Sequence, residues 1–87
     1  MEEKIILYGT TWCAGSRRAK QLFDENKIDY RWVDIDKERS ARAIVEGINH
    51  GNRSVPTIVF PDGKTLTEPS MNELADLLGV ELPPSFF

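Results

Sequence analysis

A cysteine between an apolar run and a helical pattern constrains the fold more than any other stretch of the chain. Residues 5–8, Ile-Ile-Leu-Tyr, are apolar throughout, which indicates a strand that is buried on both faces. Polar and small residues surround Cys13, and residues 14–25 then have the spacing of an amphipathic helix. The only cysteine of the chain is therefore expected where a buried strand ends and a helix begins.

A thiol at the start of a helix is in a reactive environment. The first N–H groups of a helix lack carbonyl partners, and the helix dipole places positive potential at the same end. Arg17, Arg18 and Lys20 add positive charge nearby. These features favour the thiolate, which is the nucleophilic form of cysteine. We therefore expect Cys13 to be a nucleophile rather than a buried structural thiol.

Length and composition limit the remaining possibilities. The 87 residues have room for one small domain, so we expect residues 1–87 to form a single domain whose residues 80–87 are an extended tail. Hydrophobic residues make up 40% and charged residues 29%, which is typical of a globular domain and excludes disorder. A net charge of -3 without a basic run argues against nucleic acid as a partner.

The cysteine count and the apolar pattern also predict the compartment. One cysteine cannot form an internal disulfide, and an exposed thiol stays reduced in the cytoplasm. The sequence has no signal-peptide pattern before its first strand and no apolar run of membrane-spanning length. We expect a cytoplasmic monomer that has no membrane partner.

Periodicity predicts an α/β fold with the order β-α-β-α-β-β-α. Alternation and helical spacing place the elements after the first helix at residues 28–34, 41–48, 58–60, 65–67 and 71–78. A right-handed β-α-β unit makes the first two strands parallel. A turn at residues 61–64 joins the last two strands as a hairpin, with the third strand antiparallel to the first. Helices would then cover both faces of the sheet.

Helix ends carry further local signals. Asp34 or Asp36 is a candidate N-cap for the second helix, because a short carboxylate side chain bonds well to free N–H groups. Ser70 and Glu73 have the spacing of a capping box before the third helix. Gly79 follows the last apolar position and is expected to end that helix.

The strand–Trp-Cys–helix junction, the segment Ser54-Val55-Pro56-Thr57 and the element order together resemble the glutaredoxin branch of the thioredoxin fold. Residues 51–57 and 62–70 look most like the mycoredoxins and related small bacterial glutaredoxin-like proteins. The resemblance implies a thioredoxin-like α/β fold in which three helices flank a four-stranded mixed sheet. It also implies a thiol–disulfide oxidoreductase.

The resemblance assigns roles to particular residues. Cys13 is the nucleophile, and Pro56 is a cis-proline that faces the thiol and turns the Val55 N–H and C=O toward a strand-like substrate. Without the resemblance, Pro56 would be interpreted as an ordinary trans proline that opens an edge strand. The candidate catalytic residues are Cys13, Ser16 and Arg17. The candidate substrate-binding residues are Thr11, Trp12, Ala14, Gly15, Arg53, Val55, Pro56, Thr67 and Ser70.

One departure from the family pattern affects the reaction cycle. Dithiol members have a second cysteine three positions after the first, where this chain has Ser16. Ser16 is either the native residue of a monothiol protein or a replacement that traps an intermediate. In both cases Cys13 cannot be resolved by a second thiol of the same chain.

A second departure affects binding of the small thiol. Members that bind glutathione usually have a lysine at the position of Thr10 and a Gly-Gly-x-Asp segment at residues 67–70. Arg53 and the backbone N–H groups beside Ser70 would partly replace this carboxylate clamp, whereas Glu68 would repel a carboxylate. The identity of the small thiol is left open by these residues.

The favoured interpretation is monothiol exchange between Cys13 and mixed disulfides of client proteins with a small thiol. It requires no cofactor and no metal, only glutathione or a mycothiol-like thiol as cosubstrate. One alternative is a dimer that holds an iron–sulfur cluster with external thiols, since such a cluster needs about four thiolates. The other is a non-catalytic module that binds a partner through its groove or through the Phe86-Phe87 tail.

Overall fold

A mixed four-stranded sheet forms the centre of the protein. The computed structural model describes residues 4–86 and contains strands β1 (Ile5–Gly9), β2 (Tyr30–Asp34), β3 (Thr57–Val59) and β4 (Thr65–Thr67). Their order in the sheet is β2-β1-β3-β4. β1 is parallel to β2 and antiparallel to β3, and β3 is antiparallel to β4. The predicted strand directions are therefore confirmed.

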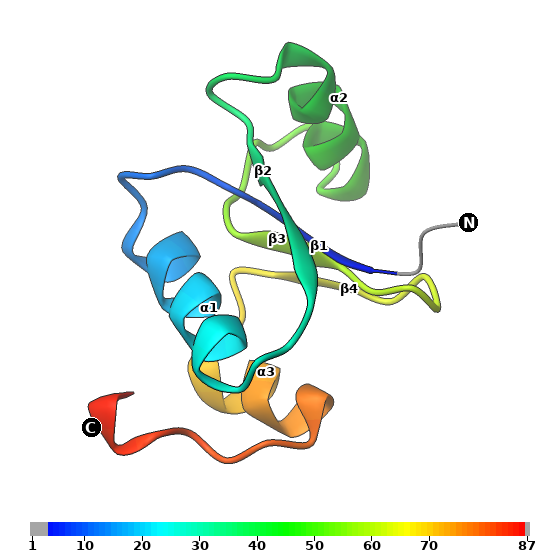
Figure 1. Ribbon diagram of the computed structural model, residues 1–87. Helices are drawn as coiled ribbons and strands as arrows, with labels where there is room; N and C mark the ends of the chain where they lie inside the picture. The colour runs from blue at the N-terminus through cyan, green and yellow to red at the C-terminus, as the bar shows by residue number, and fades with distance from the viewer. Residues whose placement is uncertain (1–3, 87) are drawn as a thin grey trace.

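Helices cover both faces of this sheet. α1 (Ala14–Glu25) and α3 (Met71–Leu78) lie on one face, and α2 (Arg39–Ile48) lies on the other, at the top of Figure 1. A 3₁₀ turn, η1 (Pro84–Phe86), follows α3 near the end of the described chain. The architecture is the thioredoxin-like fold that the family resemblance implied. Within residues 4–86, none of the helices has the length and apolar character needed to span a membrane.

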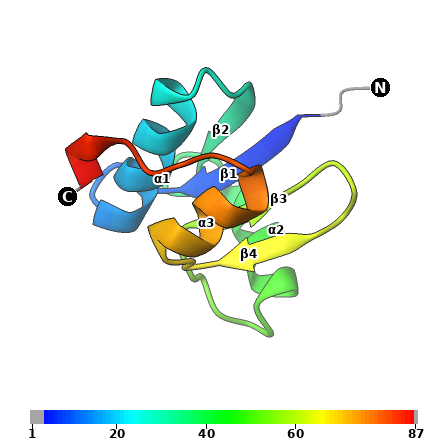
Figure 2. The same cartoon turned by 90° about the horizontal axis from the view of Figure 1, so that it is seen from below.

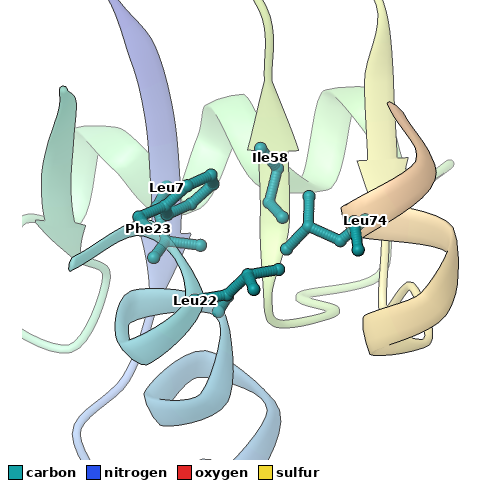
Figure 3. Close-up of a cluster of buried hydrophobic side chains, with 7 residues drawn as sticks. Leu7, Leu22, Phe23, Ile58 and Leu74 are labelled. Atoms are coloured by element: carbon teal, nitrogen blue, oxygen red, sulfur yellow. The ribbon is translucent and has the colours of Figure 1, made fainter. Parts of the chain in front are cut away.

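The larger core lies between the sheet and the helix pair α1 and α3. Successive side chains of a strand point to opposite faces, so Leu7 of β1 faces this core while Tyr8 faces α2. Figure 3 shows the fully buried side chains that meet there, which are Leu7, Leu22, Phe23, Ile58 and Leu74. A smaller cluster under α2 contains Tyr8, Val33, Ile35, Ala41 and Val45.

The ends of α3 follow the local signals in the sequence. The Glu73 N–H donates to Ser70 Oγ and the Ser70 N–H donates to Glu73 Oε1, each over 3.0 Å, which confirms the capping box. Gly79 closes the helix in the left-handed conformation, with φ of 71°. These bonds fix the start of α3 directly after β4.

Three local predictions differ from the structure. α2 begins after Glu38, so the prediction that Asp34 or Asp36 caps this helix is wrong. Asp34 instead closes a turn by accepting the Asp36 N–H at 2.9 Å. The third strand lies one residue earlier than predicted, at Thr57–Val59. The tail is not extended throughout, because Pro84–Phe86 form the 3₁₀ turn, and Phe87 lies outside the described residues.

The two leucines on α3 provide a matched test of this core. Leu74 is fully buried, whereas Leu77 is 41% exposed. We expect Leu74→Ala to lower the free energy of unfolding by about 2–5 kcal/mol, because it removes buried methyl groups and leaves a cavity. Leu77→Ala should lower it by about 1 kcal/mol or less. Urea denaturation measures both, and equal losses would contradict the packing described above.

Candidate active site

Cys13 is the N-cap residue of α1. Its backbone is extended (φ −81°, ψ 121°), and its carbonyl oxygen accepts the Arg17 N–H at 3.1 Å, the first bond of the helix. The side chain is half-buried, and Sγ lies 3.6 Å from the Val55 carbonyl oxygen, toward which the thiol donates. The sulfur is therefore placed between the first turn of α1 and the loop before β3.

The loop before β3 contacts the first turn of α1 closely. The Val55–Pro56 peptide bond is cis, as the resemblance implied. A Cβ built on Gly15 would lie 3.0 Å from Pro56 Cδ and 3.8 Å from Cys13 Sγ. A larger residue at position 15 would therefore crowd the proline ring, so glycine permits the approach of helix and loop. Cys13, Gly15, Val55 and Pro56, all singled out from the sequence, are brought together here.

Ser16 lies below the surface of the site. It is fully buried, and its Oγ accepts the Thr10 N–H at 3.3 Å. A Cβ on Gly9 would overlap Ser16 Oγ, so the end of β1 and the first turn of α1 are in direct contact at this point. Thr10, which stands where glutathione-binding members usually have a lysine, is also buried and does not replace that positive charge. Ser16 therefore holds the loop that carries Cys13.

Trp12 and Arg17 make polar contacts on the surface of the same loop. Trp12 is 68% exposed, and its Nε1 donates to Asp36 Oδ2 at 2.8 Å. Arg17 Nη1 donates to the Thr11 carbonyl oxygen at 3.1 Å. The sequence analysis missed Asp36 as a partner of Trp12, because the two residues are far apart in the chain. The indole ring of Trp12 is thus tied to the loop after β2 and keeps much of its surface open to solvent.

Two predicted binding residues are engaged elsewhere. Arg53 Nε pairs with Glu46 Oε2 of α2 at 2.7 Å, and Thr67 Oγ1 donates to Asn49 Oδ1. The charge of Arg53 is therefore shared with a carboxylate and is weaker as an anion site than the sequence suggested. The Glu68 N–H donates to the Pro56 carbonyl oxygen at 2.8 Å, which ties the β4–α3 loop to the proline.

A cavity of about 440 Å³ opens beside the thiol loop, between the starts of α1 and α3. Predicted binding residues Ala14, Gly15 and Ser70 line it together. The residues that sequence reasoning did not assign to this site are Arg18, Pro69, Met71, Asn72, Leu82 and Phe86. The cavity is thus built from segments distant in sequence. Within residues 4–86, no group of three or more His, Cys, Asp or Glu side chains is placed to hold a metal ion.

The comparison with protein families agrees with this geometry. The glutaredoxin family model matches residues 5–66, from β1 through most of β4. The chain belongs to the glutaredoxin family. Its enzymatic activity is that of a thiol–disulfide oxidoreductase.

Individual relatives and a solved structure support the same assignment. A Mycobacterium tuberculosis protein with a provisional glutaredoxin name is 44% identical over 70 residues, which cover 80% of this chain and 83% of the relative. Mycoredoxin 1 of Corynebacterium glutamicum is 33% identical over 70 residues, covering 80% and 86%. A substituted form of the thioredoxin-like protein BC3987 superposes with a TM-score of 0.78 at 26% identity, covering 92% of this chain and all of that chain.

Removing the Ser16 hydroxyl tests its role beneath the thiol. We expect Ser16→Ala to lower the free energy of unfolding by about 1–3 kcal/mol, because the buried Thr10 N–H loses its acceptor. Ser40→Ala is the matched control, since Ser40 is exposed on α2. Urea denaturation compares the two variants, and equal small losses would show that the buried hydrogen bond is unimportant.

The bond between Trp12 and Asp36 can be tested without a substrate. Asp36→Ala should move the NMR signal of the Trp12 indole N–H toward that of a free indole in water, because its carboxylate partner is gone. Asp76→Ala removes an exposed carboxylate from α3 and should leave this signal in place. If the indole signal is the same in wild type and Asp36→Ala, the two side chains are not bonded in solution.

Proposed function

We propose that this glutaredoxin reduces mixed disulfides between proteins and a low-molecular-weight thiol by a monothiol mechanism. The observation that carries the proposal is the position of the chain's only thiol. Cys13 Sγ lies at the start of α1 and 3.6 Å from the Val55 carbonyl oxygen, and the neighbouring Ala14 and Gly15 line the cavity. A sulfur in this position is reachable by a disulfide from solvent and has space beside it for a small substituent.

The first step transfers the small thiol to the enzyme. The Cys13 thiolate attacks the small-thiol sulfur of the mixed disulfide, and the S–S bond to the client breaks. The client leaves as a thiolate and takes a proton from water. Cys13 then carries the small thiol as a new mixed disulfide, with the cavity beside it.

The second step regenerates the enzyme. The thiolate of a second small-thiol molecule attacks the small-thiol sulfur on Cys13, which forms a symmetrical small-thiol disulfide and releases the Cys13 thiolate. A hydroxyl cannot form a disulfide, so Ser16 takes no part in electron transfer. In the net reaction one free small thiol is consumed for each mixed disulfide, and the products are a client thiol and the symmetrical small-thiol disulfide.

The neighbouring residues have proposed binding roles. The exposed Trp12 ring, Thr11 and the backbone of Val55 would contact the client peptide. Arg53 and Thr67 would have a weaker part in binding, because their side chains are bonded to Glu46 and Asn49. Ala14, Gly15, Pro56 and Ser70 would contact the small thiol, and Arg17 would support the loop through Thr11. The small thiol is glutathione or a mycothiol-like compound. We propose that the protein acts as a monomer in the cytoplasm, where such thiols are kept reduced.

A turnover assay tests this function directly. The assay couples the reduction of the glutathione mixed disulfide of a carrier protein to consumption of glutathione, and a second arm uses the corresponding mycothiol substrates. We expect Cys13→Ser to lower the rate to the uncatalysed background in both arms, because the nucleophile is lost. Ser54→Ala, a change at a partly buried loop residue, serves as the matched control and should retain activity.

Equal turnover by wild type and Cys13→Ser would remove Cys13 from the reaction. Absence of turnover by the wild type with both small thiols would contradict the proposed substrate class.

A further inference from the structure

The C-terminal segment forms one wall of the cavity beside the thiol loop. Figure 2 shows this segment returning from the end of α3 toward α1. Leu82 and Phe86 line the cavity together with Ala14 and Gly15, and both side chains also pack against the main core. The wall lies beyond residue 66, where the match to the glutaredoxin family model ends. Part of the cavity wall is therefore formed by residues outside the region that matches the glutaredoxin family model.

Hydrogen bonds hold the segment in place against α1. Ser85 Oγ donates to the Glu25 carboxylate at 3.0 Å and accepts from Gln21 Nε2 at 3.2 Å. The Phe86 N–H donates to the Pro83 carbonyl oxygen at 3.0 Å. Two of these bonds join Ser85 to side chains on α1, and the third closes the turn within the segment's own backbone. Phe86 is thus a fixed part of the cavity.

The described residues that line the cavity include one positively charged side chain and several apolar ones. Arg18 is the one charged side chain among the described residues that line the cavity, and no acidic residue is among them. Leu82, Phe86 and Met71 supply the apolar surface. A ligand that fits this lining combines an anionic group, placed at Arg18, with apolar or ring surface that packs on Phe86.

We propose that Phe86, Leu82 and Arg18 determine which small thiol the enzyme accepts, by binding the part of that thiol farthest from its sulfur. The proposal rests on the function proposed above, because the ligand is the thiol carried on Cys13. The preferred cosubstrate is then a thiol that has a carboxylate or another anionic group in the part farthest from its sulfur. Phe86 and Leu82 contribute packing, and Arg18 contributes charge.

The test compares a large anionic disulfide with a small neutral one. Reaction of Cys13 with glutathione disulfide and with 2-hydroxyethyl disulfide is followed by the intact mass of the mixed disulfide. Phe86→Ala should slow the reaction with glutathione disulfide about three- to tenfold and leave the reaction with 2-hydroxyethyl disulfide unchanged. Phe86→Leu, which keeps an apolar wall, should recover part of the loss.

A second comparison isolates the charge. Arg18→Gln should slow the reaction with glutathione disulfide about two- to fivefold. It should leave the rate unchanged for the tetraethyl ester of glutathione disulfide, in which all four carboxylates are masked. Leu77→Ala is the control for a change of apolar surface near α3, because Leu77 does not line the cavity.

The proposal is overturned if the tail and Arg18 variants leave the ratio of the two rates as it is in the wild type, or slow both probes equally. This outcome is distinct from failure of the proposed function. That failure would appear as equal turnover by wild type and Cys13→Ser, whatever the behaviour of Phe86. Circular dichroism of each variant confirms that a rate change does not arise from unfolding.

Discussion

The contact between the first turn of α1 and the Val55–Pro56 loop determines where the reactive sulfur lies. Gly15 allows the proline ring to approach the helix, and Cys13 Sγ consequently reaches the Val55 carbonyl oxygen. The helix itself is fixed from below by Ser16 against Gly9 and Thr10. Every feature of the proposed chemistry depends on this junction, because the sulfur, the Val55 backbone and the cavity all meet there.

The Val55 carbonyl oxygen is the acceptor for which the sulfur and the proposed substrate would compete. In the free protein it accepts a hydrogen bond from the Cys13 thiol, with Sγ 3.6 Å away. The same carbonyl is the group that would accept an N–H of a strand-like client peptide in the proposed function. A peptide bound in this way would replace the thiol at this backbone acceptor.

The sequence was informative where neighbouring residues act on one another. The strand of residues 5–8, the capping box of Ser70 and the terminating Gly79 depend on local periodicity and local hydrogen bonds, and all three are found in the structure, although Ile5 and Ile6 are only partly buried. The cis bond before Pro56 came from the family resemblance, since spacing alone favoured a trans bond.

Contacts between distant segments were beyond sequence reasoning. Asp36 has the pattern of a helix cap, yet its carboxylate bonds to Trp12 across two loops. Arg53 was expected as a free charge, but folding places it beside Glu46. Residues 80–87 contain no sequence motif from which the place of Phe86 in the same cavity as Gly15 could be predicted. Each of these depends on tertiary packing, which local patterns do not encode.

The rate of Cys13 alkylation tests the central claim most directly. Iodoacetamide at neutral pH is compared between the folded protein and an unstructured peptide that contains residues 10–18. The position of the sulfur predicts that the folded protein reacts faster, because the half-buried thiol lies beside the unpaired N–H groups that begin α1. A folded protein that reacts no faster than the peptide would contradict the assignment of Cys13 as an activated nucleophile.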